Sequence, residues 1–312
     1  MNEPAYKIVR DLIRLCDYDG ASRLVDAGLQ RCEDKGSSPE VWNLRFARAD
    51  LTRLRGHTEE ALAYLSAKEK EFPPEINDVP SLIGLKKTCG YCQGMLGKYA
   101  ISDLLLEEAE HLARNAGLLE LLCEVWNCQA WFQYVRLNFE SSDRLFREIL
   151  DASEQTGDWY FRAIGLWGVG KNIMMRGHVN GDATLLKEAL RWFEESHDLF
   201  AAAGRQRFAY GDMAVCHLDL GDDQKSLELL EELLPVYAEA GWVHSYQVTI
   251  ANIGNVYRIR GDYLRAIDYY RTAVEYAQEI KDPVSVRKWT QNIRLSYFLL
   301  RQSIEQMRTA TA

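Results

Sequence analysis

Proline and glycine are scarce, with 7 and 21 residues among the 312 of the chain. This scarcity excludes collagen-like and long proline-rich disordered stretches. Basic residues are outnumbered, because 37 Lys and Arg stand against 46 Asp and Glu, which gives a net charge of −9. A chain this acidic is poorly suited to neutralising phosphates, so we expect no nucleic-acid partner.

Long hydrophobic runs are also missing. No stretch nears the about 18 uncharged apolar residues of a membrane span, and the first residues lack the apolar core of a secretion signal. The seven cysteines are an odd number, which favours reduced thiols over a set of disulfides. We therefore expect a cytoplasmic protein that does not interact with a membrane.

Sets of catalytic or metal-binding residues are missing as well. The six histidines have no metal-ligand spacing, and the CxxC pair of Cys89 and Cys92 has no matching second ligand pair. The phosphate-loop spacing GxxxxGK occurs from Gly165 to Lys171, but Asn172 replaces the required Ser or Thr within a helical pattern. We expect no catalytic residue, no metal site, no cofactor and no enzyme activity.

A repeat of about 40 residues dominates what is present. Its clearest copy, residues 247–283, predicts two amphipathic helices separated by a turn at Gly261 and Asp262. The second helix opens its inner stripe with a small residue, and this feature recurs along the chain at Ala21, Ala61, Ser102, Ser142, Ala189, Ser226 and Ala266. A small side chain there lets two helices approach closely, so we expect these residues to be buried.

Two copies of the repeat depart from this pattern. The interval from Ser142 to Ala189 is 47 residues, which we ascribe to a longer turn at residues 178–186. In the fourth copy Asn138 is taken to replace the turn glycine.

The series of small and large residues in 247–283, from Gly254 and Tyr257 through Gly261 to Ala266 and Tyr270, resembles the tetratricopeptide repeat. The resemblance implies an all-α fold, a right-handed α-solenoid of stacked helix-turn-helix repeats. It places seven repeats at approximately 5–36, 40–72, 80–117, 119–158, 160–204, 206–241 and 246–283. Residues 284–312 are then a C-terminal capping helix and a frayed tail, with an inner stripe of Trp289, Ile293 and Tyr297. Arg287, Arg294 and Arg301 share its water-facing side because they lie seven residues apart.

In this family the first helices of the repeats line a concave groove. The resemblance assigns the groove to aromatic, amide and cationic residues, namely Lys87, Tyr91, Asn127, Trp131, Tyr134, Trp167, Lys171, Asn255 and Arg258. The same register adds Phe46, Asp50, Arg53, Glu124, Met174, Gly211, Val215, Val248 and Ala251. This composition is typical of a protein-recognition surface, although the aromatic residues would also suit a tightly wound core.

Three functions stay open. The first is a non-catalytic scaffold that binds a protein or peptide on the concave face. The second is a regulatory sensor array, because residues 80–117 are similar to repeat arrays placed before bacterial CHAT-type, caspase-like protease domains; the effector would act in cis or in trans. The third is a peptide-sensing regulator, which the lack of a helix-turn-helix and the acidic balance make less suited to DNA.

Overall fold

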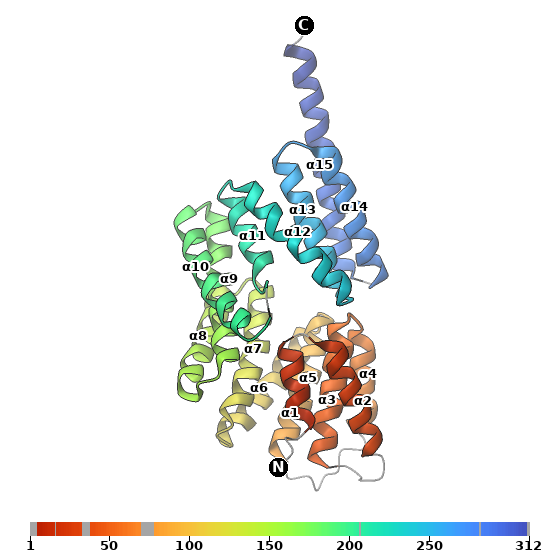
Figure 1. Cartoon of the computed structure of the whole chain (residues 1–312), viewed down its shortest axis with the longest axis vertical. Coiled ribbons are helices and arrows are strands. Elements are labelled where there is room, and N and C mark those ends of the chain that lie inside the picture. Colours follow the sequence, from red (N-terminus) through yellow and green to blue (C-terminus); the bar gives the residue numbers. More distant parts are fainter. Residues whose placement is uncertain are drawn as a thin grey trace. The chain divides into compact units, whose positions relative to one another are not determined.

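The computed structural model describes residues 5–15, 17–32, 38–69, 78–205, 207–280 and 282–310. Within these residues the chain forms α-helices and no strand, as expected (Figure 1). The helices of the first half are α1 (Ala5–Arg14), α2 (Tyr18–Arg31), α3 (Pro39–Leu54), α4 (Thr58–Glu69), α5 (Val79–Met95), α6 (Tyr99–Asn115), α7 (Leu119–Val135) and α8 (Phe139–Thr156). Those of the second half are α9 (Trp159–Asn180), α10 (Ala183–Ala202), α11 (Tyr210–Asp219), α12 (Asp223–Glu239), α13 (Val243–Ile259), α14 (Tyr263–Glu279) and α15 (Pro283–Ala310).

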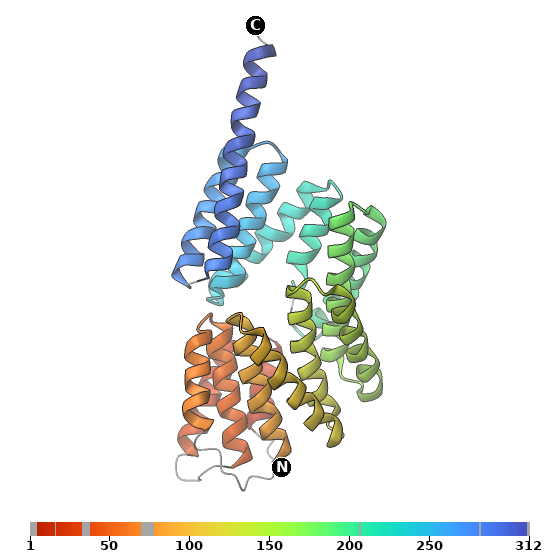
Figure 2. The same ribbon diagram turned by 180° about the vertical axis from the view of Figure 1, so that it is seen from behind.

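The chain divides into two compact units. Unit 1 consists of Met1–Met175 and Arg191–Phe208, and unit 2 of Arg176–Leu190 and Ala209–Ala312. Within each unit, successive helices pack side by side as hairpins, and each hairpin packs on the next (Figures 1 and 2). The fold is therefore an all-α helical-repeat solenoid. In the described part of the chain, no helix combines the length and the apolar character that crossing a membrane requires.

The turn between paired helices follows directly from the local sequence. After α13, Gly261 adopts a φ of 79°, and its N–H donates to the carbonyl of Arg258. The carboxylate of Asp262 then accepts from the N–H of Arg265 at 3.2 Å and caps α14. Glycine tolerates the left-handed conformation, and an aspartate at the N-cap satisfies an otherwise unpaired N–H.

The fourth hairpin turn differs from the expectation. The residue with the left-handed backbone is Leu137, at φ 64°, and not Asn138. Asn138 stands at the N-cap of α8, the position that Asp262 occupies before α14. The residue that replaces the turn glycine is thus Leu137, whose side chain is 67% exposed.

The prediction for the small residues of the second helices is confirmed. All seven are fully buried, and they lie on the even-numbered helices α2 to α14: Ala21, Ala61, Ser102, Ser142, Ala189, Ser226 and Ala266. The long interval in this series has another cause than the one expected, because residues 178–180 continue α9 and residues 183–186 already belong to α10. Longer helices, and not a longer turn, separate Ser142 from Ala189 by 47 residues.

The glycines of the apparent phosphate loop lie inside α9, where they allow close packing. A Cβ on Gly168 would come within 2.2 Å of the Phe146 ring, and one on Gly170 within 2.9 Å of Phe193. Gly254 has the same role in α13, where a Cβ would meet Tyr270 at 2.9 Å. Gly168, Gly170 and Gly254 are therefore packing residues.

The cysteines also belong to the core. Cys89 and Cys92 lie in α5, 9% and 0% exposed, in a cluster with Trp42 and Leu85. All described cysteines are free and buried, whereas Cys16 lies outside the described residues. Burial raises the pKa of Cys92 to about 12, which keeps this thiol protonated and unreactive at neutral pH.

Candidate functional site

The nine main residues expected to line the groove all lie on odd-numbered helices, and all nine are half-buried. In unit 1, Lys87 and Tyr91 are on α5, Asn127, Trp131 and Tyr134 on α7, and Trp167 and Lys171 on α9. In unit 2, Asn255 and Arg258 are on α13. The prediction for three of the additional positions is wrong, because these side chains are buried in the core: Phe46 at 6%, Met174 at 4% and Ala251 at 0% exposure.

Four of the expected residues form what we name the aromatic–lysine cluster: Trp131, Tyr134, Trp167 and Lys171. The ammonium of Lys171 lies 5.0 Å from the ring centroid of Trp167, 5.1 Å from that of Tyr134 and 5.6 Å from that of Trp131. These distances are those of cation–π attraction. The Trp131 ring stacks on Trp167 with centroids 6.2 Å apart and on Tyr134 at 5.7 Å, so the rings hold one another in place.

The aromatic surface continues to residues that the sequence analysis did not identify. The Trp167 centroid lies 6.0 Å from that of Phe208, and the guanidinium of Arg205 lies 4.5 Å from the Phe208 centroid. Arg205 and Phe208 follow the end of α10, outside the repeated helices. The repeat register therefore gives no signal for them.

A second polar group lies on the neighbouring helices α5 and α7. The Nζ of Lys87 donates to Oε2 of Glu124 at 2.6 Å. Burial works to raise the pKa of Glu124, but the charge of Lys87 outweighs it and holds this pKa below its usual range. Lys87 is thus already engaged within the chain.

Tyr91 is engaged in the same way. Its ring lies 4.2 Å from the guanidinium of Arg53 on α3, which is also 3.5 Å from the carboxylate of Asp50. Burial raises the pKa of Tyr91 to about 12, although Arg53 acts in the opposite direction. The Tyr91 hydroxyl therefore stays protonated at neutral pH.

Helix α1 joins this group from a distant part of the sequence. Nη1 of Arg10 lies 2.9 Å from Oε2 of Glu120 on α7, and Nη1 of Arg14 lies 3.3 Å from Oδ2 of Asp158, just before α9. The Arg14 guanidinium also lies 4.5 Å from the ring centroid of Tyr160. The first helix of unit 1 therefore contacts helices more than a hundred residues further along the chain.

In unit 2 the two expected residues are tied to a core tyrosine. The hydroxyl of Tyr270 donates to Oδ1 of Asn255 at 2.6 Å, and Nε of Arg258 lies 3.4 Å from the same hydroxyl. Tyr270 itself is fully buried. This arrangement fixes the amide and the guanidinium on one side of α13.

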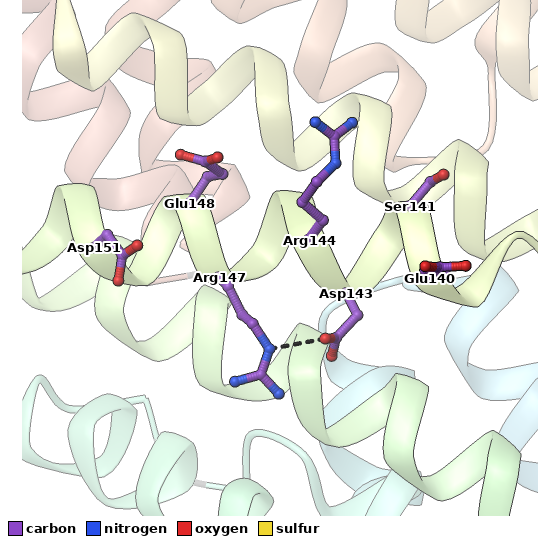
Figure 3. A pocket seen from close by; sticks show the side chains of 7 residues that line it. All are labelled: Glu140, Ser141, Asp143, Arg144, Arg147, Glu148 and Asp151. Atoms are coloured by element: carbon purple, nitrogen blue, oxygen red, sulfur yellow. Dashed lines mark hydrogen bonds and ion pairs between the residues drawn. The ribbon is translucent and has the colours of Figure 1, made fainter.

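A surface depression of about 440 Å³ lies elsewhere, along α8 (Figure 3). Its lining side chains all come from this single helix and include charges of both signs: Glu140, Ser141, Asp143, Arg144, Arg147, Glu148 and Asp151. Arg147 and Asp143 satisfy each other at 2.8 Å. Among the residues that the structure describes, no second element contributes a converging group, so this depression lacks the features of an enclosed ligand site. Nor do the described residues include three or more His, Cys, Asp or Glu placed to hold a metal ion.

Neither a family model nor a curated protein sequence matches the chain. Among solved structures, the chain is similar to a Rap protein complexed with competence and sporulation factor, with a TM-score of 0.63 and 16% identity, over 98% of this chain and 85% of the Rap chain. It is also similar to a signal transduction ATPase with numerous domains (STAND) that has a tetratricopeptide repeat sensor, from Pyrococcus horikoshii, with a TM-score of 0.52 and 14% identity. That match covers 100% of this chain and 47% of the ATPase chain. The chain thus has the fold of the tetratricopeptide-repeat proteins.

Proposed function

We propose that the chain is a non-catalytic protein–protein interaction scaffold that binds a polypeptide segment on the concave face of its solenoid. The observation that carries this proposal is the aromatic–lysine cluster, in which Lys171 is held by Trp131, Tyr134 and Trp167. Aromatic side chains such as these are among the residue types enriched in protein interfaces and in their energetic hot spots. An acidic, cytoplasmic chain with seven repeats at the boundaries expected above suits this role. Three of those repeat boundaries, at residues 36, 72 and 206, and the tail residues 311–312 lie outside the described residues.

The fixed geometry of the cluster supports the proposal. The stacked rings and the lysine restrain one another before any partner arrives. A preformed surface limits the entropy cost of binding to that of ordering the partner segment. We assign the main contact to this cluster, and secondary contacts to Lys87, Tyr91 and Asn127 in unit 1 and to Asn255 and Arg258 in unit 2.

Two related functions also have support. The Rap neighbour is complexed with competence and sporulation factor, which favours a peptide-sensing regulator. The second neighbour is a signalling ATPase in which a tetratricopeptide repeat sensor is one part of a longer chain. This second likeness favours a sensor array that controls an effector, such as a CHAT-type protease, in cis or in trans. Both alternatives retain a bound polypeptide as the input.

The proposal is tested by selecting peptides from a displayed random library on the purified chain and measuring their affinities by fluorescence anisotropy. Trp131→Ala combined with Trp167→Ala removes two rings of the cluster. We expect this double variant to lose at least about 30-fold in affinity, since two interface tryptophans at about 1–2 kcal/mol each correspond to such a loss.

The matched control is Trp192→Ala, which removes a half-buried tryptophan of unit 1 from the even-numbered helix α10. This variant is expected to bind within about threefold of the wild type. Circular dichroism verifies that all variants are folded. Peptides that bind the three proteins equally, or a library that yields no binder, would contradict the proposal.

A further inference from the structure

An apolar stripe runs along the whole of α15. Its residues follow one another at intervals of seven, four, three, four and three: Val286, Ile293, Tyr297, Leu300, Ile304 and Met307. The alternation of threes and fours is the spacing of the a and d positions of a coiled coil. Such a stripe packs along one face of a second helix.

The first part of this stripe packs in the core of unit 2. Val286 and Ile293 pack with Trp289 against Tyr270 and Ala273 of α14. Figure 1 shows the C-terminal part of α15 extending beyond the hairpin of α13 and α14.

The second part of the stripe is accessible from solvent. Tyr297 is 45% exposed, Ile304 39% and Met307 59%, while Leu300 is half-buried. The prediction that Tyr297 belongs to the inner stripe of this helix is therefore wrong. The Tyr297 hydroxyl instead accepts from Arg271 of α14 at 2.7 Å.

A row of arginines accompanies the stripe. Each of the four follows a stripe residue by one position and is exposed: Arg287, Arg294, Arg301 and Arg308. Residues 283–310 carry five basic side chains and one acidic side chain, Glu305, in a chain whose net charge is −9. In coiled-coil geometry these arginines stand at e positions, where flanking charges select the partner and its orientation.

The row of arginines makes α15 of a second copy of this chain a poorly matched partner for the stripe. In an antiparallel pair of α15 helices the e positions face each other, so that Arg301 and Arg308 would meet arginines. In a parallel pair they would face the g positions, which offer no carboxylate: Ser303 is uncharged, and Ser296 is uncharged and fully buried within unit 2. Neither arrangement supplies the carboxylates that an arginine row pairs with.

We infer that residues 297–307 of α15 are a docking surface for one amphipathic helix of a partner protein, a helix whose apolar stripe is flanked by Glu or Asp. The partner's apolar side chains cover Tyr297, Leu300 and Ile304, and its carboxylates pair with Arg301 and Arg308. The exposed stripe spans about 15 Å, at about 1.5 Å per helical residue, which is short for a coiled coil. Flanking charge pairs therefore contribute much of the affinity, and binding weakens as salt rises.

The experiment uses the full chain and two labelled helical probe peptides of about three heptads. Both have Leu at a and d, one has Glu at e and g, and the other has Lys there. We expect the Glu peptide to bind at least about tenfold more tightly than the Lys peptide by fluorescence anisotropy. Arg301→Glu with Arg308→Glu should reverse that preference, and Ile304→Gln with Met307→Gln should abolish binding of both peptides.

The matched control removes two exposed apolar residues of unit 2 that lie off the stripe, Leu264 and Val284, which are 61% and 74% exposed. Leu264→Gln with Val284→Gln should bind the Glu peptide like the wild type. Because all the substituted side chains are exposed, circular dichroism should show every variant folded.

Four outcomes would overturn the inference. Equal affinity for the two peptides would show that the arginine row does not select the partner. No binding of either peptide up to about 1 mM would show that this part of α15 is not a docking surface. A wild-type dimer in light scattering that Ile304→Gln with Met307→Gln converts to a monomer would make a second copy the occupant. Sedimentation with phosphatidylserine-containing vesicles, lost in the same variant, would identify a lipid surface instead.

Discussion

The Nζ of Lys87 lies 2.6 Å from Oε2 of Glu124, and the two side chains are only 17% and 22% exposed. Lys87→Met removes the cation and leaves a largely buried carboxylate without this partner. We expect the free energy of unfolding to fall by about 2–3 kcal/mol, since breaking a buried ion pair from one side is strongly destabilising. Urea denaturation followed by circular dichroism measures the loss.

The double variant Lys87→Met with Glu124→Met is the matched control, because it removes both charges. It should recover most of the stability lost in Lys87→Met, since an apolar pair carries no desolvation cost. If the double variant instead loses as much free energy of unfolding as Lys87→Met and Glu124→Met lose together, the two side chains are not coupled and the ion pair has no structural role.

The same pair makes stability depend on pH. Burial favours a higher pKa for Glu124, but Lys87, with Arg14 and Arg10, holds it below the ordinary 4.5. The stabilisation is therefore fully present above the pKa of the unfolded chain, and it is lost as pH falls through the lower pKa of the folded state. We expect wild type to exceed Glu124→Gln in stability at pH 7, and this difference to shrink at about pH 3. Urea midpoints of both proteins at both pH values test this, and a constant difference would contradict it.

The sequence predicts well what repeats. The small residues of the second helices recur about every 40 positions, and all seven are fully buried. Periodicity reports a packing requirement that each hairpin must meet, whatever the rest of the chain does. Likewise, Trp131, Tyr134, Trp167 and Lys171 lie together, because adjacent odd-numbered helices bring equivalent positions to one side.

What depends on one particular contact could not be predicted. The pairs of Arg10 with Glu120 and of Arg14 with Asp158 join residues 110 and 144 positions apart, and they have no local signal. Phe46 and Met174 have groove spacing but are buried, because a register error of one residue turns a side chain by about 100°. Tyr297 has core spacing but is 45% exposed, whereas the adjacent Ser296 is fully buried, so the register of α15 turns Ser296 and not Tyr297 towards the core.

Two of the buried serines are expected to respond differently to the same substitution. The hydroxyl of Ser226 is buried and finds no hydrogen-bond partner in the described part of the chain, whereas that of Ser142 accepts from Nδ2 of Asn172 at 3.1 Å. Ser226→Ala removes an unsatisfied polar group, so stability should stay unchanged or rise by up to about 1 kcal/mol. Ser142→Ala removes an acceptor and should cost about 1 kcal/mol.

Thermal and urea unfolding of the two alanine variants give this comparison directly, since each changes one oxygen atom at an equivalent position of its repeat. The order of stability is the prediction: Ser226→Ala above Ser142→Ala. A larger loss in Ser226→Ala would mean that its hydroxyl has a bonding partner in solution.

Leu137 is expected to be replaceable by glycine with a gain in stability. Its φ of 64° lies in the left-handed region, which costs a non-glycine residue about 1–2 kcal/mol. Glycine relieves that strain but loses about 0.5–1 kcal/mol more backbone entropy on folding. Because the Leu137 side chain is 67% exposed, little burial is lost, and Leu137→Gly should gain up to about 1 kcal/mol in urea denaturation.

The reciprocal control is Gly97→Ala, at φ 76° with open space around the new Cβ, which should lose about 1 kcal/mol through backbone strain alone. A destabilised Leu137→Gly beside a destabilised Gly97→Ala would show that the leucine side chain stabilises the turn by more than its backbone strain costs.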